Sequence, residues 1–140
     1  MPLGRQLDAA GNPNGVQTVE GRIHGDAPWA DFENSSSRWN SIAAINRTIS
    51  RFLQQNWEFV RSKLAEDGKL TVVVDANEII GDCYRNRNTG LGGPRVPMGP
   101  IQTPLARLNF KYIPGNPPSF FVVTSFPEHP LNLKAPVVGL

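Results

Sequence analysis

The sequence contains little cysteine and little histidine. Cys83 is the single cysteine, and His24 and His129 are the only histidines among 140 residues. One cysteine excludes an internal disulfide framework and any metal site built from several cysteines, so stability must come from a hydrophobic core. A chain of this length can bury such a core as one domain. Two histidines leave few positions for an acid–base catalyst that works near neutral pH.

Long apolar runs are also absent. No run approaches the roughly 20 residues of a membrane-spanning helix, and the N-terminus lacks the charged and apolar regions of a signal peptide. If the protein is exported, we expect another part of a larger polypeptide to direct it. The chain has no Walker loop, dinucleotide fingerprint or cluster of metal ligands, so we expect neither a cofactor nor a metal.

Acidic residues are missing from one long stretch. Between Cys83 and Pro127 there is no Asp or Glu, whereas five cations occur there: Arg85, Arg87, Arg95, Arg107 and Lys111. Residues 1–68 carry seven Lys and Arg against eight Asp and Glu, but residues 69–140 carry seven against four. We therefore expect the second half to present a positive face to an anionic partner such as RNA. A solvated face without a ligand is the alternative.

The remaining composition is that of a soluble globular domain. Hydrophobic residues make up 39% and charged residues 19%, while 13 Gly and 13 Pro indicate long ordered loops. Residues 1–21 are rich in Gly, Asn and Pro, and we expect them to form a flexible lead-in. Residues 22–140 are then predicted to form a single domain.

A helical pattern of apolar residues lies between Ser35 and Asp67. The apolar positions are mostly three or four apart: Trp39, Ile42, Ile45, Ile49, Phe52, Leu53, Trp57, Val60 and Leu64. The serines at 35–37 are candidate N-caps, and Gly68 is a candidate stop. The pattern predicts one long helix, or two helices broken near Asn56.

The pattern changes to that of strands after the helix. Residues 70–74 and 79–84 are predicted strands, and residues 86–104, with four Gly and four Pro, are predicted to be a long loop. Residues 105–113 and 119–124 alternate in polarity and predict an antiparallel hairpin, apolar on one side and cationic on the other. The order predicts an α+β fold, with an N-terminal helical part packed on a mainly antiparallel sheet.

Three short motifs then stand in an informative order. Asn56 precedes the last apolar turns of the helix, Gly81 to Arg85 fits a Gly-x-x-Tyr/Leu-Arg pattern, and the hairpin ends in Thr124-Ser125-Phe126-Pro127 where the pattern is Thr-x-Tyr-Pro. In this order, residues 38–130 resemble the RNase A-like toxin domain at the C-termini of bacterial contact-dependent inhibition and other polymorphic toxins. The resemblance covers about two thirds of the chain and rests on short, degenerate motifs.

The resemblance implies an activity and a partner. It implies an RNase A-like fold and a metal-independent endoribonuclease that cleaves RNA, with tRNA one candidate, in competition between bacteria. Such a domain would be secreted or surface-delivered within a larger polypeptide and would act in the target-cell cytoplasm. A cognate immunity protein, with an acidic surface that meets the basic one, would neutralise it. Apart from that complex we expect a monomer.

The resemblance also suggests catalytic residues. RNA cleavage by the 2′-hydroxyl needs a base, a donor to the charged phosphorane and an acid for the leaving oxygen. We assign His24 as general base or acid, with Arg38 and Thr124 as donors to the phosphorane, because imidazole titrates near neutrality and guanidinium binds phosphate oxygens. Expected substrate contacts are Arg22, Tyr84, Arg85, Arg107, Lys111 and Phe126. Trp29 and Tyr84 are candidates for stacking on a base.

The chain departs from the family pattern at two places. Phe126 lacks the hydroxyl of the family's tyrosine. The family's N-terminal His-Thr-hydrophobic-x-x-His-Val-Gly motif is only partly present: Gln17 stands where it would start, and residues 22–25 (Arg-Ile-His-Gly) replace its second histidine. His24 is then either the shifted catalytic histidine or a coincidence. Arg38 is matched by its order alone and could instead form an ion pair with Glu33 or Asp31.

Other interpretations remain open. His129 is the second histidine candidate, although its neighbouring prolines favour an exposed turn. Phe126 and the incomplete histidine motif would also fit a catalytically silent nucleic-acid-binding or interaction module with the same fold. A third possibility is an ADP-ribosyl transferase or NAD hydrolase, which would need a catalytic glutamate, and Glu128 is the only acid after Asp82.

Overall fold

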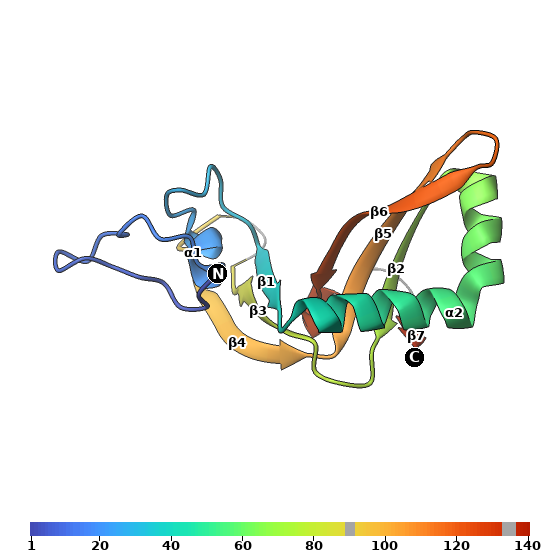
Figure 1. Ribbon diagram of the computed structural model, residues 1–140. Coiled ribbons are helices and arrows are strands. Elements are labelled where there is room, and N and C mark those ends of the chain that lie inside the picture. The colour runs from blue at the N-terminus through green and yellow to red at the C-terminus, as the bar shows by residue number, and fades with distance from the viewer. Residues whose placement is uncertain (89–91, 133–136) are drawn as a thin grey trace. The chain divides into compact units, whose positions relative to one another are not determined.

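The computed structural model describes residues 1–88, 92–132 and 137–140, which form two compact units. The first unit comprises Met1–Arg38 and Asp82–Gln102, and the second comprises Trp39–Gly81 and Thr103–Leu140. Each unit has its own sheet (Figure 1). No helix in the described part of the chain is long and apolar enough to span a membrane.

The first unit contains a short helix and a three-stranded sheet of order β1-β3-β4. Its elements are α1 (Val19–His24), β1 (Ser35–Trp39), β3 (Gly81–Asn86) and β4 (Pro97–Thr103). The Thr18 side chain caps α1 by accepting a hydrogen bond from the Gly21 amide at 2.8 Å. Val19 and Ile23 on α1 pack with Tyr84 on β3 to form the small core of this unit.

The N-terminal segment makes specific contacts within this unit. The amides of Val19 and Glu20 donate to the backbone oxygens of Pro2 and Leu3. Leu3 also packs against the small core, so the segment predicted to be a lead-in contributes backbone and side-chain contacts to α1.

β4 corrects the prediction of a continuous loop over residues 86–104. Its strand residues include Pro97 and Pro100, which cannot donate to a neighbouring strand. β4 lies at the edge of its sheet, where a missing donor is tolerated. Gly99 permits β4 to approach β3 closely, because a Cβ at this position would lie 2.7 Å from the Cys83 carbonyl oxygen. Residues 89–91 of the predicted loop lie outside the described residues.

The second unit packs one long helix on a four-stranded sheet of order β6-β5-β2-β7. Its elements are α2 (Ile42–Asp67), β2 (Lys69–Asp75), β5 (Leu105–Ile113), β6 (Ser119–Pro127), the 3-10 turn η1 (Pro130–Asn132) and β7 (Val137–Gly139). β2, β5 and β6 pair antiparallel, and β7 pairs parallel to β2. These findings confirm the α+β class and the predicted hairpin.

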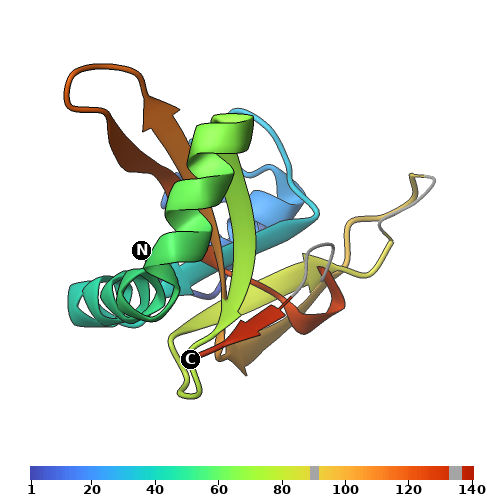
Figure 2. The same cartoon turned by 90° about the vertical axis from the view of Figure 1, so that its right-hand side faces the viewer.

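The helix α2 is interrupted where the sequence predicted. Asn56 has non-helical dihedrals (φ −130°, ψ 23°), and its side-chain amide donates to the Phe52 carbonyl at 3.1 Å. Figure 2 shows the two parts of α2 meeting at an angle. The predicted start was wrong: residues 35–39 form β1, and Ser41 is the N-cap, accepting from the Ala44 amide at 3.0 Å.

The core of the second unit lies between α2 and one face of the sheet. Phe52 on α2 stacks on Phe110 of β5, with ring centroids 5.8 Å apart. Trp57 packs on Phe120 of β6 at 5.4 Å. Leu70 and Val72 of β2 belong to the same core. Because successive side chains alternate across a strand, the residues next to the core residues along β2 and β5 point to the opposite face. That opposite face carries Lys69, Thr71, Asn109 and Lys111.

Candidate functional site

His24 is the last residue of α1 and is half-buried. Burial lowers the pKa of its imidazole below the usual 6.5, and the nearby Arg5 guanidinium lowers the pKa further. The carboxylates of Asp26 and Glu20 oppose this shift but do not outweigh it. The His24 imidazole makes no hydrogen bond or ion pair among the described residues. The neutral form of the ring therefore predominates at pH 7 and can accept a proton.

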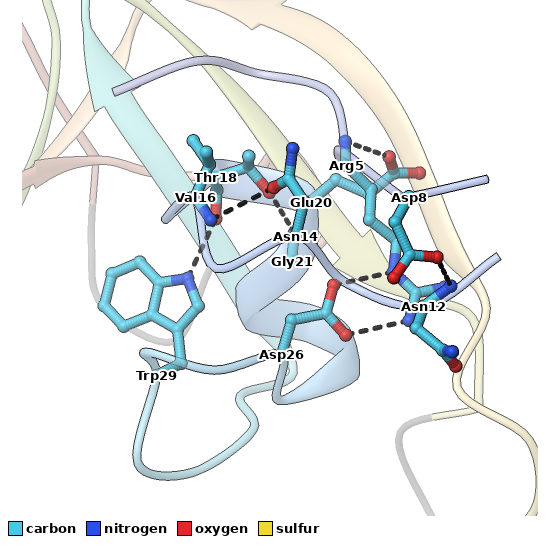
Figure 3. A network of polar contacts seen from close by, with 10 residues as sticks. All are labelled: Arg5, Asp8, Asn12, Asn14, Val16, Thr18, Glu20, Gly21, Asp26 and Trp29. Atoms are coloured by element: carbon cyan, nitrogen blue, oxygen red, sulfur yellow. Dashed lines mark hydrogen bonds and ion pairs between the residues drawn. The ribbon is translucent and has the colours of Figure 1, made fainter. Parts of the chain in front are cut away.

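A charged network fixes the segment beside His24. The Arg5 guanidinium donates to both carboxylate oxygens of Asp26, at 2.6 and 2.8 Å, and the Arg5 amide donates to Glu20 at 2.7 Å (Figure 3). Asp26 is only 8% exposed, so Arg5 compensates a carboxylate that would otherwise be costly to bury. The hydrogen bonding of Arg5 to Asp26 is also the main cause of the raised pKa of Arg5.

Arg38 lies on β1 with its guanidinium already engaged. It donates to the backbone oxygen of Met1 at 2.8 Å, and its Nε lies 3.7 Å from a carboxylate oxygen of Asp82 on β3. The acidic partner is thus Asp82, and neither Glu33 nor Asp31 fills that role. Arg38 and His24 belong to the same unit, but no hydrogen bond joins them in the described part of the chain.

The other predicted contacts of the first unit are largely structural. The Arg22 guanidinium stacks over Trp29 at 4.5 Å and lies 3.7 Å from Glu33. The Trp29 indole donates to the Thr18 carbonyl at 3.0 Å. Tyr84 is 5% exposed, so its ring serves the core of this unit and not an open surface; burial raises its pKa. Arg85 lies half-buried on β3.

Thr124 lies in the second unit, where a row of polar side chains crosses three strands. The Thr71 hydroxyl on β2 donates to the Asn109 side-chain oxygen on β5 at 2.7 Å. The Asn109 amide then donates to the Thr124 hydroxyl on β6 at 2.6 Å. Because the Thr124 oxygen accepts in this row, its own hydrogen is left to donate to a ligand. We call these three residues the polar row.

A hollow open to solvent lies over the polar row. Its volume is about 420 Å³, and its lining is Asp67, Gly68, Lys69, Thr71, Asn109, Phe110, Lys111, Val123 and Thr124. The predicted contact Lys111 therefore shares one hollow with the predicted donor Thr124. Lys69, Thr71 and Asn109 were missed in the sequence. They were missed because the antiparallel register of β2 and β5, which brings them together, cannot be deduced from the local sequence.

Arg107 and Phe126 face each other in the β5–β6 register, but Arg107 is engaged elsewhere. Its Nε lies 2.5 Å from the Glu128 carboxylate, and it donates to the Asn132 carbonyl at 3.2 Å. Glu128 and His129 are 3% and 6% exposed. The prediction of an exposed turn at His129 was therefore wrong. The segment that contains Glu128 and His129 packs against β5, and the His129 ring accepts a hydrogen bond from the Leu131 amide.

The structure thus places the three proposed catalytic residues in two units. His24 and Arg38 belong to the first unit, and Thr124 belongs to the second. Among the described residues there is no group of three or more His, Cys, Asp or Glu side chains placed to hold a metal ion.

Comparisons with known proteins give one informative likeness. No family model matches the sequence, and no curated protein matches it. One chain of the crystal structure of the CdiA-CT/CdiI complex from Y. kristensenii 33638 superposes with a TM-score of 0.57, covering 79% of this chain and 88% of that chain. The two chains share a fold. Their sequence identity is 17%, so the likeness concerns the fold alone.

Proposed function

We propose that this chain is the toxic domain of a contact-dependent inhibition system and that it cleaves RNA without a metal. The observation that carries the proposal is the fold shared with a chain of a CdiA-CT/CdiI complex. The motif order over residues 38–130 supports the same family from the sequence side. An immunity protein with an acidic surface is then the expected protein partner.

The proposed chemistry begins at His24. Its neutral imidazole takes the proton of a ribose 2′-hydroxyl, and the resulting oxygen attacks the adjacent phosphorus. The bond to the 5′-oxygen breaks, that oxygen takes up a proton from water, and the His24 imidazolium gives its proton to the resulting hydroxide. The products are a 2′,3′-cyclic phosphate and a 5′-hydroxyl. The lowered pKa of His24 supports this role, because a base must be unprotonated at the working pH.

Arg38 and Thr124 are the proposed donors to the phosphate oxygens. Both assignments come from the motif order. For Arg38, the contacts with Met1 and Asp82 would have to be exchanged for phosphate. For Thr124, the free hydroxyl hydrogen at the end of the polar row supports the role directly. Separate variants of the two residues test the two assignments independently.

Expression inside a bacterial cell tests the toxin proposal. We expect the parent chain to stop growth and to shorten RNA extracted from the cells, and His24→Ala to lose both effects. Arg61→Gln, at an exposed position on α2, is the control variant and should remain toxic. Undiminished growth with the parent chain present and folded would contradict the proposal. Toxicity that survives His24→Ala would support the toxin proposal, but it would contradict the assignment of His24 as the general base.

A catalytically silent binding module is the second candidate. Phe126 offers no hydroxyl, and the Arg38 guanidinium is held by Asp82 and Met1, so both observations favour binding without cleavage. An NAD-directed enzyme has less support. Its only candidate glutamate in the last part of the chain, Glu128, is 3% exposed and paired with Arg107.

A further inference from the structure

We propose that Lys69 and Lys111, together with the polar row, bind the phosphate backbone of single-stranded RNA on the open face of the second sheet. The inference rests on the proposed function for the identity of the ligand. It concerns a binding site wholly within the second unit, where Lys69 stands at the start of β2 and Lys111 lies near the end of β5. The sequence suggested Lys111 and Thr124 as contacts, but it did not reveal Lys69 or its pairing with Lys111.

The two lysines are direct cross-strand partners. Lys69 pairs with Lys111 in the antiparallel register of β2 and β5. Side chains in such positions lie about 5 Å apart at Cβ, and like charges directly opposite destabilise a sheet. Neither ammonium group has an ion pair within the residues that the structure describes, although Asp67 lines the same hollow. An anion bound between them would remove the repulsion.

The polar row supplies a neutral donor next to these charges. Thr71 and Asn109 direct their hydrogen bonds along the row, which leaves the Thr124 hydroxyl hydrogen for a ligand in the hollow. Two ammonium groups and one hydroxyl donor suit the two unesterified oxygens of a phosphodiester. The lysines act as point charges, so the contact does not depend on base sequence.

An exposed aromatic ring extends the site along β6. Phe121 is the register partner of Lys111, so both side chains lie on the same face of the sheet. Its side chain is 42% exposed, whereas the adjacent Phe120 packs against the buried Phe110, with ring centroids 6.1 Å apart. An unpaired base can stack on such a ring while the neighbouring phosphate meets the lysines. This combination favours a single RNA strand over an acidic protein surface.

Fluorescence anisotropy with a short, fluorescein-labelled, 2′-O-methylated RNA tests the site, because that RNA can bind but cannot be cleaved through its 2′-oxygen. The test variant is Lys69→Gln/Lys111→Gln. The matched control is Arg47→Gln/Arg61→Gln, which removes the same charge from exposed positions on α2. Circular dichroism verifies that each variant is folded.

We expect the test variant to bind about tenfold or more weakly. The slope of log Kd against log salt concentration should fall by about 1.4, since each phosphate contact to a single strand contributes about 0.7. The control should keep the slope of the parent. Phe121→Leu should weaken binding without changing the slope, because stacking releases no counterions.

Three results would overturn the site. The first is an unchanged Kd and slope in the lysine variant, and the second is no binding of the RNA by the parent. The third is tighter binding of poly-glutamate than of RNA to the lysine pair, which would assign this face to an acidic protein. Failure of the proposed function looks different. A parent that binds the RNA through the lysine pair but does not cleave unmodified RNA would contradict the ribonuclease and support this site.

Discussion

The imidazole of His24 acquires its low pKa from its surroundings in the first unit. Burial at the end of α1 is the larger cause, and the charge of Arg5 is the next. Neither cause is visible in the local sequence, because Arg5 is far from His24 along the chain and is placed by its bonds to Asp26. The sequence could name the histidine as a candidate, but it could not predict its protonation state.

The low pKa of His24 predicts a pH dependence of stability. Between the usual value near 6.5 and the lowered value, the unfolded chain binds the proton and the folded chain does not, so the free energy of unfolding should fall as the pH decreases. Well above pH 6.5, at about pH 8, the ring is neutral in both states and its contribution to the pH dependence vanishes. Urea unfolding at about pH 5 and about pH 8 measures the change.

The comparison variant for this prediction is His24→Gln, which lacks the titrating ring. We expect the parent to lose more stability than the variant on acidification. An equal loss in the two proteins would show that His24 has an ordinary pKa, and it would weaken the assignment of this residue as a base.

Other single residues show why a site is hard to read from sequence. Arg107 and Lys111 both lie in the acid-free stretch, yet Arg107 is paired with Glu128, which stands just beyond that stretch and reaches it through the fold. Tyr84 and His129 were expected to be accessible, but both are buried. Exposure depends on contacts between distant segments, which local composition does not specify.

At the scale of elements, the hydrophobic period predicted the type of most segments. α2, its break at Asn56 and the β5–β6 hairpin follow from periodicity and polar alternation. The start of α2 was misplaced because the serines at 35–37 are good caps in isolation, whereas pairing in the first sheet holds them extended. β4 was missed because its prolines argue against a strand everywhere except at an edge.

The position of the α2 cap can be tested directly. Ser41→Ala should lower the free energy of unfolding by about 1 kcal/mol, because the Ala44 amide loses its acceptor. Ser50→Ala, at an exposed position within the same helix, is the control and should be neutral or slightly stabilising. Urea unfolding of the three proteins gives the values, and equal stabilities of the two variants would place the cap elsewhere.

The close approach of β4 to β3 gives a second test at this scale. Gly99→Ala should destabilise the chain by roughly 1–3 kcal/mol, because the added Cβ would meet the Cys83 carbonyl and the residue has φ +136°. Gly15→Ala also has a positive φ, of +84°, but no atom within 4 Å, so it should cost less. Thermal unfolding ranks the variants; a cost for Gly15→Ala equal to that of Gly99→Ala would contradict the close contact.

At the scale of the whole molecule, the α+β class was predictable because a helical pattern precedes the strands. The structure confirms that class and adds the likeness to a chain of a CdiA-CT/CdiI complex. The division into two compact units was not predicted, since both units are built from segments distant in the chain. The Lys69–Lys111 pair escaped notice for the same reason, because strand register is a property of the fold.

The measurement that tests the central claim is cleavage of total RNA by the purified protein with EDTA present. We expect the parent to produce 2′,3′-cyclic phosphate ends, and the folded His24→Ala variant to produce none. Arg61→Gln, the exposed control on α2, should cleave like the parent. Absence of cleavage by the folded parent, over the pH range where His24 is neutral, would contradict the claim that this chain is a metal-independent ribonuclease.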